Sequence, residues 1–341
     1  MPDESTPRRP RSQTVSEFVR DIKETADRLE ADGIGRGEAK LLSTALRELR
    51  YAFKVFSQYR GKRKVTVFGS ARTKPDHPTY QLAVEFSRQM AALDYITVTG
   101  AGGGIMEAGH VGAGRDMSLG LNILLPFEQS ANPVMTGSDR LMTMRYFFTR
   151  KLMFVKETDA VVLFPGGFGT HDEGFEALTL IQTGKSHIFP VVMVDQPGGT
   201  YWKRFNDFIE HELLGNKLIS PADMGLYKVC LSVEEAVQEV TNFYRVYHSM
   251  RYVRKDLMMR FIKPISDTTL AYVNLNYKDI IWEGDIARSE ADPMEANEPH
   301  LASLFRLRFK FDRHGHARLR HMIDYINEAE SQPTGAGKMD V

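Results

Sequence analysis

The sequence predicts an α/β fold, a Rossmann-like doubly wound parallel sheet with an N-terminal helical extension and a small C-terminal α+β appendage. Three observations support this class. Short apolar segments alternate with helical segments of about 10–15 residues across most of the chain. Glycine clusters follow three of the apolar segments, where ligands bind in parallel sheets. The 341 residues exceed one ordinary core, which favours a main domain with an appendage.

Composition and periodicity divide the chain into five stretches. The two ends are rich in small and polar residues and are expected to be disordered. The helical extension begins at a capping box in Thr14-Val-Ser-Glu17, and its second helix is expected from 38 to 56. In chain order, the stretches are a tail at 1–13, the extension at 14–60, the Rossmann-like domain at 61–250, the appendage at 251–330 and a tail at 331–341.

The elements of the Rossmann-like domain follow in order from their periodicity. The expected strands are short and apolar, and they lie at 65–68, 96–99, 118–125, 140–144, 160–164, 188–194 and 226–231. Helices are expected between them at 81–93, 106–115, 146–157, 175–183 and 202–214, with a further helix capped by Ser232.

In the appendage, apolar and basic side chains alternate over 305–311. This predicts a half-buried strand whose basic face is solvated or paired with acids rather than bound to nucleic acid. A helix is expected at 317–327.

Composition argues against several classes of protein. Lys+Arg and Asp+Glu both number 44, so no net basic field favours nucleic acid or a membrane as a partner. Cys230 is the single cysteine, which excludes a disulfide framework and predicts a packing role in a buried strand. The N-terminus lacks the apolar core of a signal peptide, and no run reaches the ~18 apolar residues of a spanning helix. A cytoplasmic protein is therefore expected.

The strongest motif is Phe164-Pro-Gly-Gly-Phe-Gly-Thr-His-Asp-Glu173, between an expected strand and helix. Its glycines are expected to take left-handed angles and to let the backbone approach a ligand. The helix N-terminus that follows would favour a phosphate, and Glu173 would project toward the same cleft. A tight turn with a helix-starting acid is the structural alternative. The phosphate-binding candidates here are Gly166, Gly167, Gly169 and Thr170.

Two further turns follow strands. One is Gly100-Ala-Gly-Gly-Gly-Ile-Met-Glu107, and the other is Gly69-Ser-Ala-Arg72, whose serine could donate to a phosphate or ribose. The second is neither a P-loop nor the usual dinucleotide fingerprint. Because the ends of parallel strands share one edge, these turns could face one crevice with the first. Their nucleotide-binding candidates are Gly69, Ser70, Gly102, Gly103 and Gly104.

The histidines raise the possibility of a metal site. His314, His316 and His321 are close in sequence, but no acid or cysteine completes a recognisable ligand spacing. His171 and His187 are expected to flank the cleft in surface or supporting roles. No metal site is therefore predicted.

The combined motifs resemble those of the Lonely Guy family of cytokinin-activating phosphoribohydrolases, once mislabelled lysine decarboxylases. Residues 165–173 are similar to the family's PGGxGTxxE signature, and Arg150-Lys151 to its Arg-Lys pair. Gly102–Met106 resembles its glycine-rich turn, and Tyr201-Trp202 falls where it has an aromatic pair. The resemblance covers about residues 62–245. Phe148-Thr149 departs from the His-Glu of plant-type members.

The resemblance implies that the N-glycosidic bond of a nucleoside 5′-monophosphate is hydrolysed to a free base and ribose 5-phosphate. The substrate would be AMP-like or a cytokinin riboside monophosphate, with no cofactor. A homodimer with sites near the subunit interface is also implied. By carry-over, Arg150 and Glu173 are the catalytic pair, and Lys151 joins the phosphate-binding set. A carboxylate beneath the ribose would stabilise the positive charge that builds there or orient the attacking water.

Two alternatives remain open. A non-catalytic carrier of a nucleotide or of the molybdenum cofactor could share the fold, although the paired Arg150 and Glu173 favour an enzyme. A pyridoxal-phosphate decarboxylase would need a lysine in a distinctive Schiff-base context, which the sequence does not offer.

Overall fold

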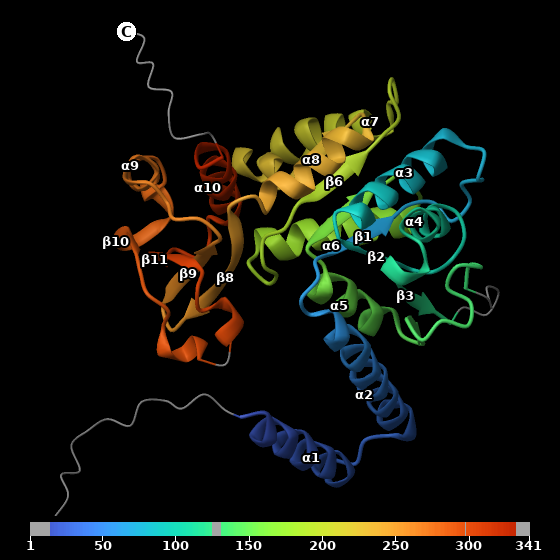
Figure 1. The fold of residues 1–341 in the computed structure, drawn as a ribbon. Helices are drawn as coiled ribbons and strands as arrows, with labels where there is room; N and C mark the ends of the chain where they lie inside the picture. The colour runs from blue at the N-terminus through green and yellow to red at the C-terminus, as the bar shows by residue number, and fades with distance from the viewer. Residues whose placement is uncertain (1–13, 125–130, 297, 332–341) are drawn as a thin grey trace, which may run out of the picture.

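The computed structural model describes residues 14–124, 131–296 and 298–331. These residues form a seven-stranded parallel sheet flanked by helices, a four-stranded antiparallel sheet beside it, and two helices that precede both (Figure 1). The doubly wound α/β fold is therefore confirmed. The described residues contain no helix that is both long and apolar enough to cross a membrane.

The large sheet has the order β4-β3-β2-β1-β5-β6-β7, and each neighbouring pair is parallel. The chain builds outward from β1 on one side and then returns to add β5 on the other, so the strand order reverses between β1 and β5. Open α/β sheets bind ligands at such a reversal. The strands are β1 (Lys64–Phe68), β2 (Ile96–Thr99), β3 (Ser118–Ile123), β4 (Leu141–Met144), β5 (Ala160–Leu163), β6 (Val191–Val194) and β7 (Tyr227–Cys230).

Helices cover both faces of this sheet, which explains why its strands are apolar on both sides. Along β5, Val161 and Leu163 join one core cluster, and Val162 joins the other. The helices are α3 (Pro78–Ala92), α4 (Ile105–Ala113), α5 (Phe147–Glu157), α6 (Phe168–Gln182), α7 (Tyr201–Phe208), which continues as a π-helix (Ile209–Leu214), and α8 (Val233–Phe243). Short 3-10 helices lie at Ser57–Tyr59, Arg115–Met117, Pro221–Leu226, Lys278–Ile280, Pro293–Glu295 and Pro299–Leu301.

Two boundaries differ from expectation in ways that matter for the site. The helix expected at 175–183 begins seven residues earlier, at Phe168, so Thr170 is its third residue. The strand expected to start at 188 begins at Val191. Position 125, the expected end of another strand, lies outside the described residues.

Cys230 ends β7 as a buried, free thiol. Burial raises the pKa of this thiol to about 12, so it stays protonated at neutral pH. The expected packing role fits this environment.

The extension consists of α1 (Val15–Ala31) and α2 (Arg36–Phe56). The Thr14 capping box is present. The second half of α2 buries Ala52, Val55 and Phe56, and α2 packs against α5 and β4. No residue of α1 is buried within the described part of the chain.

The smaller sheet has the antiparallel order β10-β11-β9-β8. Its first strand starts at Tyr247, so the boundary expected after residue 250 falls inside β8. Only β11 and the last helix were assigned from the sequence. The elements are β8 (Tyr247–Val253), β9 (Asp256–Phe261), α9 (Asp267–Asn276), β10 (Ile281–Arg288), β11 (Phe305–Phe311) and α10 (His316–Ala329).

The appendage packs against the edge of the large sheet where strands β1 and β5 begin. Arg63, just before β1, donates to the carbonyl of His248 at 3.3 Å. The Tyr244 hydroxyl donates to the carbonyl of Asp159, just before β5, at 2.7 Å. This edge is opposite to the strand ends that carry the glycine turns.

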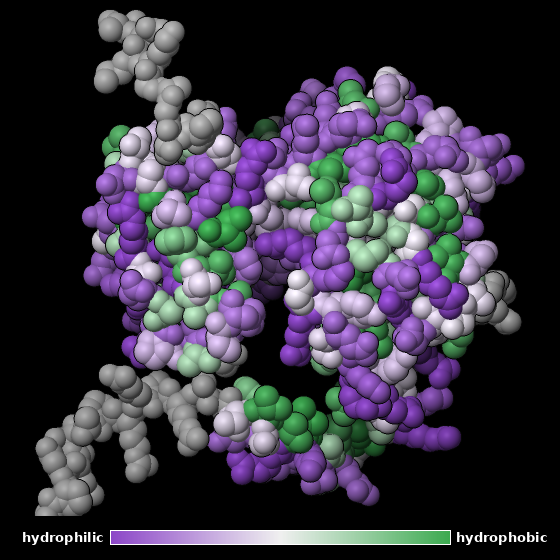
Figure 2. Space-filling model, in the orientation of Figure 1, coloured by the Kyte–Doolittle hydropathy of each residue, from purple (hydrophilic) through white to green (hydrophobic). Residues whose placement is uncertain are grey.

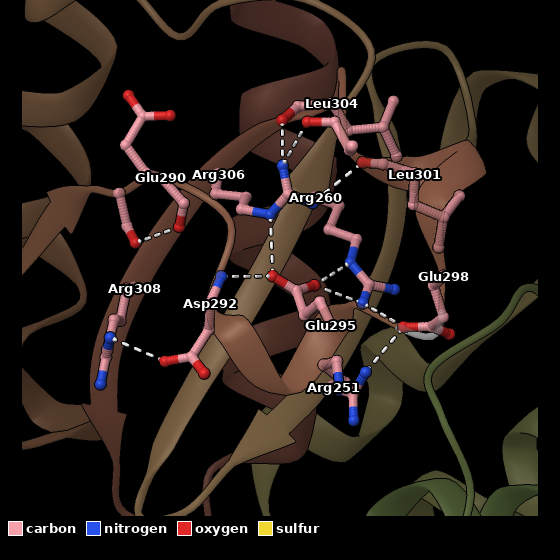
Figure 3. Close-up of polar contacts among 12 residues, drawn as sticks. Arg251, Arg260, Glu290, Asp292, Glu295, Glu298, Leu301, Leu304, Arg306 and Arg308 are labelled. Atoms are coloured by element: carbon pink, nitrogen blue, oxygen red, sulfur yellow. Dashed lines mark hydrogen bonds and ion pairs between the residues drawn. The ribbon is translucent and has the colours of Figure 1, made fainter.

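The basic face of β11 pairs with acids (Figure 3). Arg306 is buried, and its Nε lies 3.0 Å from Glu295 Oε2, while Nε of Arg260 on β9 lies 2.7 Å from Glu295 Oε1. Arg308 lies beside Asp256 at 2.6 Å. The pairing alternative is thus confirmed at these positions, and the network ties the segment around Glu295 to the sheet.

Candidate functional site

A cavity of about 780 Å³ opens at the carboxyl ends of β1 and β5, where the strand order reverses. It is lined by the turns after both strands, by the first turns of α6, by Met106 of α4 and by Phe147 and Arg150 of α5. The predicted site residues that it brings together are Gly69, Ser70, Arg150, Gly166, Gly167, Gly169, Thr170 and Glu173.

The first turn of α6 offers unpaired donors to this cavity. Gly167 is the N-cap and provides no side-chain cap. Among the described residues, no acceptor is found for the backbone N–H groups of Phe168 and Gly169. Together with the partial positive charge of a helix N-terminus, these groups form a site suited to a phosphate.

The glycines of this turn are required for space, not for left-handed angles. None of Gly166, Gly167 and Gly169 has a positive φ, so that expectation is wrong. A Cβ on Gly166 would overlap the Thr170 hydroxyl and lie 3.0 Å from Ser70 N. No atom lies within 4 Å of a Cβ built on Gly167 or Gly169, so both positions leave room for a ligand.

Ser70 is held in place by its neighbours. Its N–H donates to the Pro165 carbonyl at 3.2 Å, and its carbonyl accepts from Ile105 N at 3.0 Å. Gly104 has φ +63°, and a Cβ there would overlap the Ser70 carbonyl. The turn of Gly102, Gly103 and Gly104 therefore supports Ser70 but is not among the residues that line the cavity, and its contact with a nucleotide stays a prediction.

Arg150 brings a positive charge to the cavity, and no anion from residues 14–124, 131–296 or 298–331 is bonded to it. Its Nε is buried and has no hydrogen-bond partner in the described part of the chain. The guanidinium lies beside Gly100, where a Cβ would approach a terminal nitrogen to 2.6 Å, and 5.2 Å from the Phe154 ring centre. Burial lowers the pKa of Arg150, while the Glu173 carboxylate opposes this shift. An anionic ligand would satisfy this cation.

Glu173 lies in the second turn of α6 and also lines the cavity. Burial raises the pKa of its carboxyl to about 7, although the charges of Lys151 and Arg150 oppose the shift. Its carboxyl forms no hydrogen bond or ion pair with the residues that the structure describes. A carboxyl that titrates near neutral pH in a cavity is suited to acid–base or electrostatic catalysis.

Lys151 points away from this cavity. Its Nζ lies 2.8 Å from Asp172 and 2.8 Å from Glu176, so it joins α5 to α6. It does not line the cavity itself, although its partner Asp172 does, and its role in phosphate binding stays a prediction. Lys151 affects Glu173 through its charge, which opposes the rise in the pKa of that carboxyl.

Sequence reasoning missed two aromatic side chains at the cavity. Phe168 is 96% exposed and Phe147 is 54% exposed, and both line the cavity. Two phenyl rings exposed beside one pocket form an apolar surface of the kind that a ligand or a partner covers. Phe168 stands within the recognised motif, but its spacing alone does not indicate whether the ring is buried.

Tyr201 and His171 support the turn from behind. The Tyr201 hydroxyl donates to the Gly166 carbonyl at 2.5 Å, and His171 Nε2 lies 2.7 Å from the same hydroxyl. His171 lines the cavity, whereas His187 bonds the Thr158 carbonyl at the far end of β5. The expectation that His187 flanks the cleft is therefore wrong.

Glu48 of α2 holds the N-terminus of α5. Its carboxylate accepts from Arg145 N and from the Thr149 hydroxyl, both at 2.7 Å. Thr149 directly precedes Arg150, so the extension helps to position the arginine. A contact between residues about 100 positions apart leaves no local signal in the sequence.

No group of three potential metal ligands is found among the described residues. His316 is buried against Gly184, and His321 lies against Gly225. His316 and His321 therefore serve the packing of α10, whereas His314 is exposed.

The chain is similar to known proteins over part of its length. Residues 103–240 match the model of the family described as "Possible lysine decarboxylase". A cytokinin riboside 5′-monophosphate phosphoribohydrolase from Rhodococcoides fascians is 30% identical over 104 residues, which are 30% of this chain and 50% of that protein. The matched stretch thus spans about half of the length of that relative.

Solved structures of similar shape include the molybdenum cofactor carrier protein from Chlamydomonas reinhardtii. It is 20% identical, covers 53% of this chain and 96% of its own, and has a TM-score of 0.38. DNA processing protein A from Helicobacter pylori is 13% identical over 52% of this chain and 79% of its own, with a TM-score of 0.37. Because both scores are low, the fold class rests on the observed sheet.

Proposed function

We propose that this chain is a nucleoside 5′-monophosphate phosphoribohydrolase of the Lonely Guy family, which the match over residues 103–240 and the partial similarity to a phosphoribohydrolase support. It would hydrolyse the N-glycosidic bond of an AMP-like nucleotide or a cytokinin riboside monophosphate. The products would be the free base and ribose 5-phosphate. The single observation that carries this proposal is that Glu173, Arg150 and the unpaired amides of α6 face one cavity.

The 5′-phosphate would bind at the N-terminus of α6. Phe168 and Gly169 would donate their backbone N–H groups, and the hydroxyls of Thr170 and Ser70 would add further donors. Arg150 supplies the positive charge from the other wall. This binding, remote from the reacting carbon, would hold the ribose over Glu173.

The reaction then needs little beyond charge stabilisation and a positioned water. As the bond from C1′ to the base nitrogen breaks, positive charge builds on the ribose, and the Glu173 carboxylate stabilises it. The oxygen of a water molecule forms a bond to C1′. One water proton leaves from that oxygen, and one proton ends on the departing base.

The exposed rings of Phe147 and Phe168 would provide the surface for the base. Both are close to the cavity and present apolar faces to solvent. Stacking tolerates different bases because every base has a π-face. This arrangement would accept different bases, since it does not select one by hydrogen bonds.

The test is incubation of the purified chain with AMP, CMP, GMP and isopentenyladenosine monophosphate, followed by measurement of free base and ribose 5-phosphate. We expect both products in equal amounts from at least one nucleotide. Glu173→Gln is expected to retain nucleotide binding and lose most turnover, whereas Glu176→Gln retains turnover. Binding of a nucleotide without release of base from any of them would support the carrier alternative instead.

A further inference from the structure

The extension carries an apolar stripe with no cover in the described part of the chain. Val15, Phe18, Val19 and Ile22 lie on one face of α1, and they are 80%, 53%, 45% and 49% exposed. Figure 2 shows this apolar surface on α1, facing an open gap between the helix and the rest of the molecule. The stripe is not part of the proposed nucleotide site.

A helix in this situation is poorly stabilised on its own. Isolated helices of roughly this length are marginal in water, and most helical stability in proteins comes from packing of the apolar face. The capping box fixes only the start of α1. The amphipathic pattern therefore indicates that another surface covers the stripe.

A second uncovered stripe lies on α2. Leu42, Leu46 and Phe53 are 44%, 51% and 41% exposed, and they border the face of α2 that packs on α5 and β4. These residues recur at positions i, i+4 and i+11, which fall on one side of a helix. Each copy of the chain thus presents two apolar stripes on adjacent helices.

The charges of the two helices are complementary. The α1 segment carries five acidic and three basic side chains. The α2 segment carries five basic and two acidic side chains. Packing of α1 on α2 is therefore electrostatically favoured, whereas packing of α1 on α1 or of α2 on α2 brings like charges together.

We propose that α1 of one copy packs on α2 of a second copy, and that the reciprocal contact completes a two-fold dimer. Such an exchange is self-complementary, as a two-fold interface must be. The same chain does not satisfy its own stripes, because α1 buries none of its residues within the described structure. The linker at Asp32–Gly35 directs α1 away from its own α2 (Figure 1).

The area available is sufficient for a stable dimer. Seven stripe residues on each copy would each lose roughly 90 Å², about half of what a fully buried large side chain removes from water. The two reciprocal contacts then cover roughly 1,300 Å², which exceeds the ~1,000 Å² expected of a specific interface. The dimer would also brace α2, whose Glu48 holds the helix that carries Arg150.

The first test measures mass in solution by light scattering and sedimentation over a range of concentrations. We expect a dimer for the full chain and at least a 100-fold weaker dimer for Phe18→Ser/Ile22→Ser. The matched control is Arg20→Ser/Glu24→Ser, which has the same spacing on the opposite face and leaves the net charge unchanged. Because α1 buries nothing in one copy, the urea midpoint of the Rossmann-like domain should be unchanged in both variants when it is measured at a concentration where wild type is monomeric.

The second test identifies the pairing. A chain with Ile22→Cys is mixed with a differently sized chain with Leu46→Cys under mild oxidation, while the native Cys230 stays buried. Formation of the mixed cross-link is the expected result. A monomer at all concentrations, a dimer that the Phe18/Ile22 variant does not weaken, or cross-links only between identical chains would each overturn the proposal. These measurements need no nucleotide, so they stand apart from the test of hydrolysis.

Discussion

The raised pKa of Glu173 predicts that this carboxyl lowers the stability of the protein at the pH where it is charged. The group has a folded-state pKa of about 7, whereas an exposed glutamate has an ordinary value of 4.5. The folded state therefore keeps the proton in a range where the unfolded state has lost it. Stability contributed by the bound proton is complete below about pH 4.5 and is lost as the pH rises to about 7.

The size of the effect follows from the shift. A difference of about 2.5 pKa units corresponds to about 3 kcal/mol at 1.36 kcal/mol per unit. Above pH 7, wild type pays this cost and Glu173→Gln does not. We therefore expect Glu173→Gln to be more stable than wild type by up to about 3 kcal/mol at pH 8.5, and by much less at pH 5.

Urea unfolding of wild type and Glu173→Gln at pH 5, 7 and 8.5 measures this difference. The control is Glu176→Gln, because Glu176 is ion-paired with Lys151 and its loss should give no gain at high pH. If the free energies of unfolding of wild type and Glu173→Gln change in parallel with pH, burial does not raise the pKa of Glu173. The assignment of this carboxyl as a group poised for catalysis would then fail with it.

Three further predictions concern the site and the appendage. Thr170→Val is expected to weaken binding of ribose 5-phosphate about 10-fold, measured by calorimetry, because one hydrogen bond to a charged group is lost; unchanged affinity would place the phosphate elsewhere. Gly167→Ala should raise KM but keep the urea midpoint, since it fills ligand space, whereas Gly166→Ala should lower the midpoint through its overlap with Thr170; equal midpoints would contradict this. Glu295→Ala should cost about 3–5 kcal/mol of unfolding free energy by leaving the buried Arg306 without an anion and Arg260 with Glu298 alone, against at most ~1 kcal/mol for the exposed Asp279→Ala; similar costs would show that the buried network is not special.

The regular parts of the fold were predictable because their signals are local. The strand at 96–99 and the start of β5 at Ala160 were expected at the positions observed. The appendage was predicted least well, since β8, β9, β10 and α9 lack a clean alternation in sequence. Along β10, Ile281 and Ile286 are buried while most residues between them are exposed, because its pairing with β11 is irregular.

The sequence predicted most of the residues that form the site, but it predicted less well how their side chains are arranged. Glu173 and the Gly166–Thr170 turn were expected at a strand end, and they line the cavity. The sequence placed Lys151 beside Arg150, yet successive residues on a helix point about 100° apart, so one faces the cavity and the other faces Asp172 and Glu176. The exposure of Phe168 depends on distant parts of the chain, and so does the hydrogen bond that Glu48 accepts from Thr149 of α5.

The sequence by itself determined the alternation of strands and helices, the strand ends that bear glycine, and the acid one turn into α6, because each depends on residues within a few positions. Only the tertiary structure decided that the order reverses between β1 and β5, which brings Ser70, Arg150 and Glu173 to one cavity. It also decided the protonation of Glu173, since a carboxyl's pKa is set by its burial and by charges from other elements, and neither is written in the neighbouring residues.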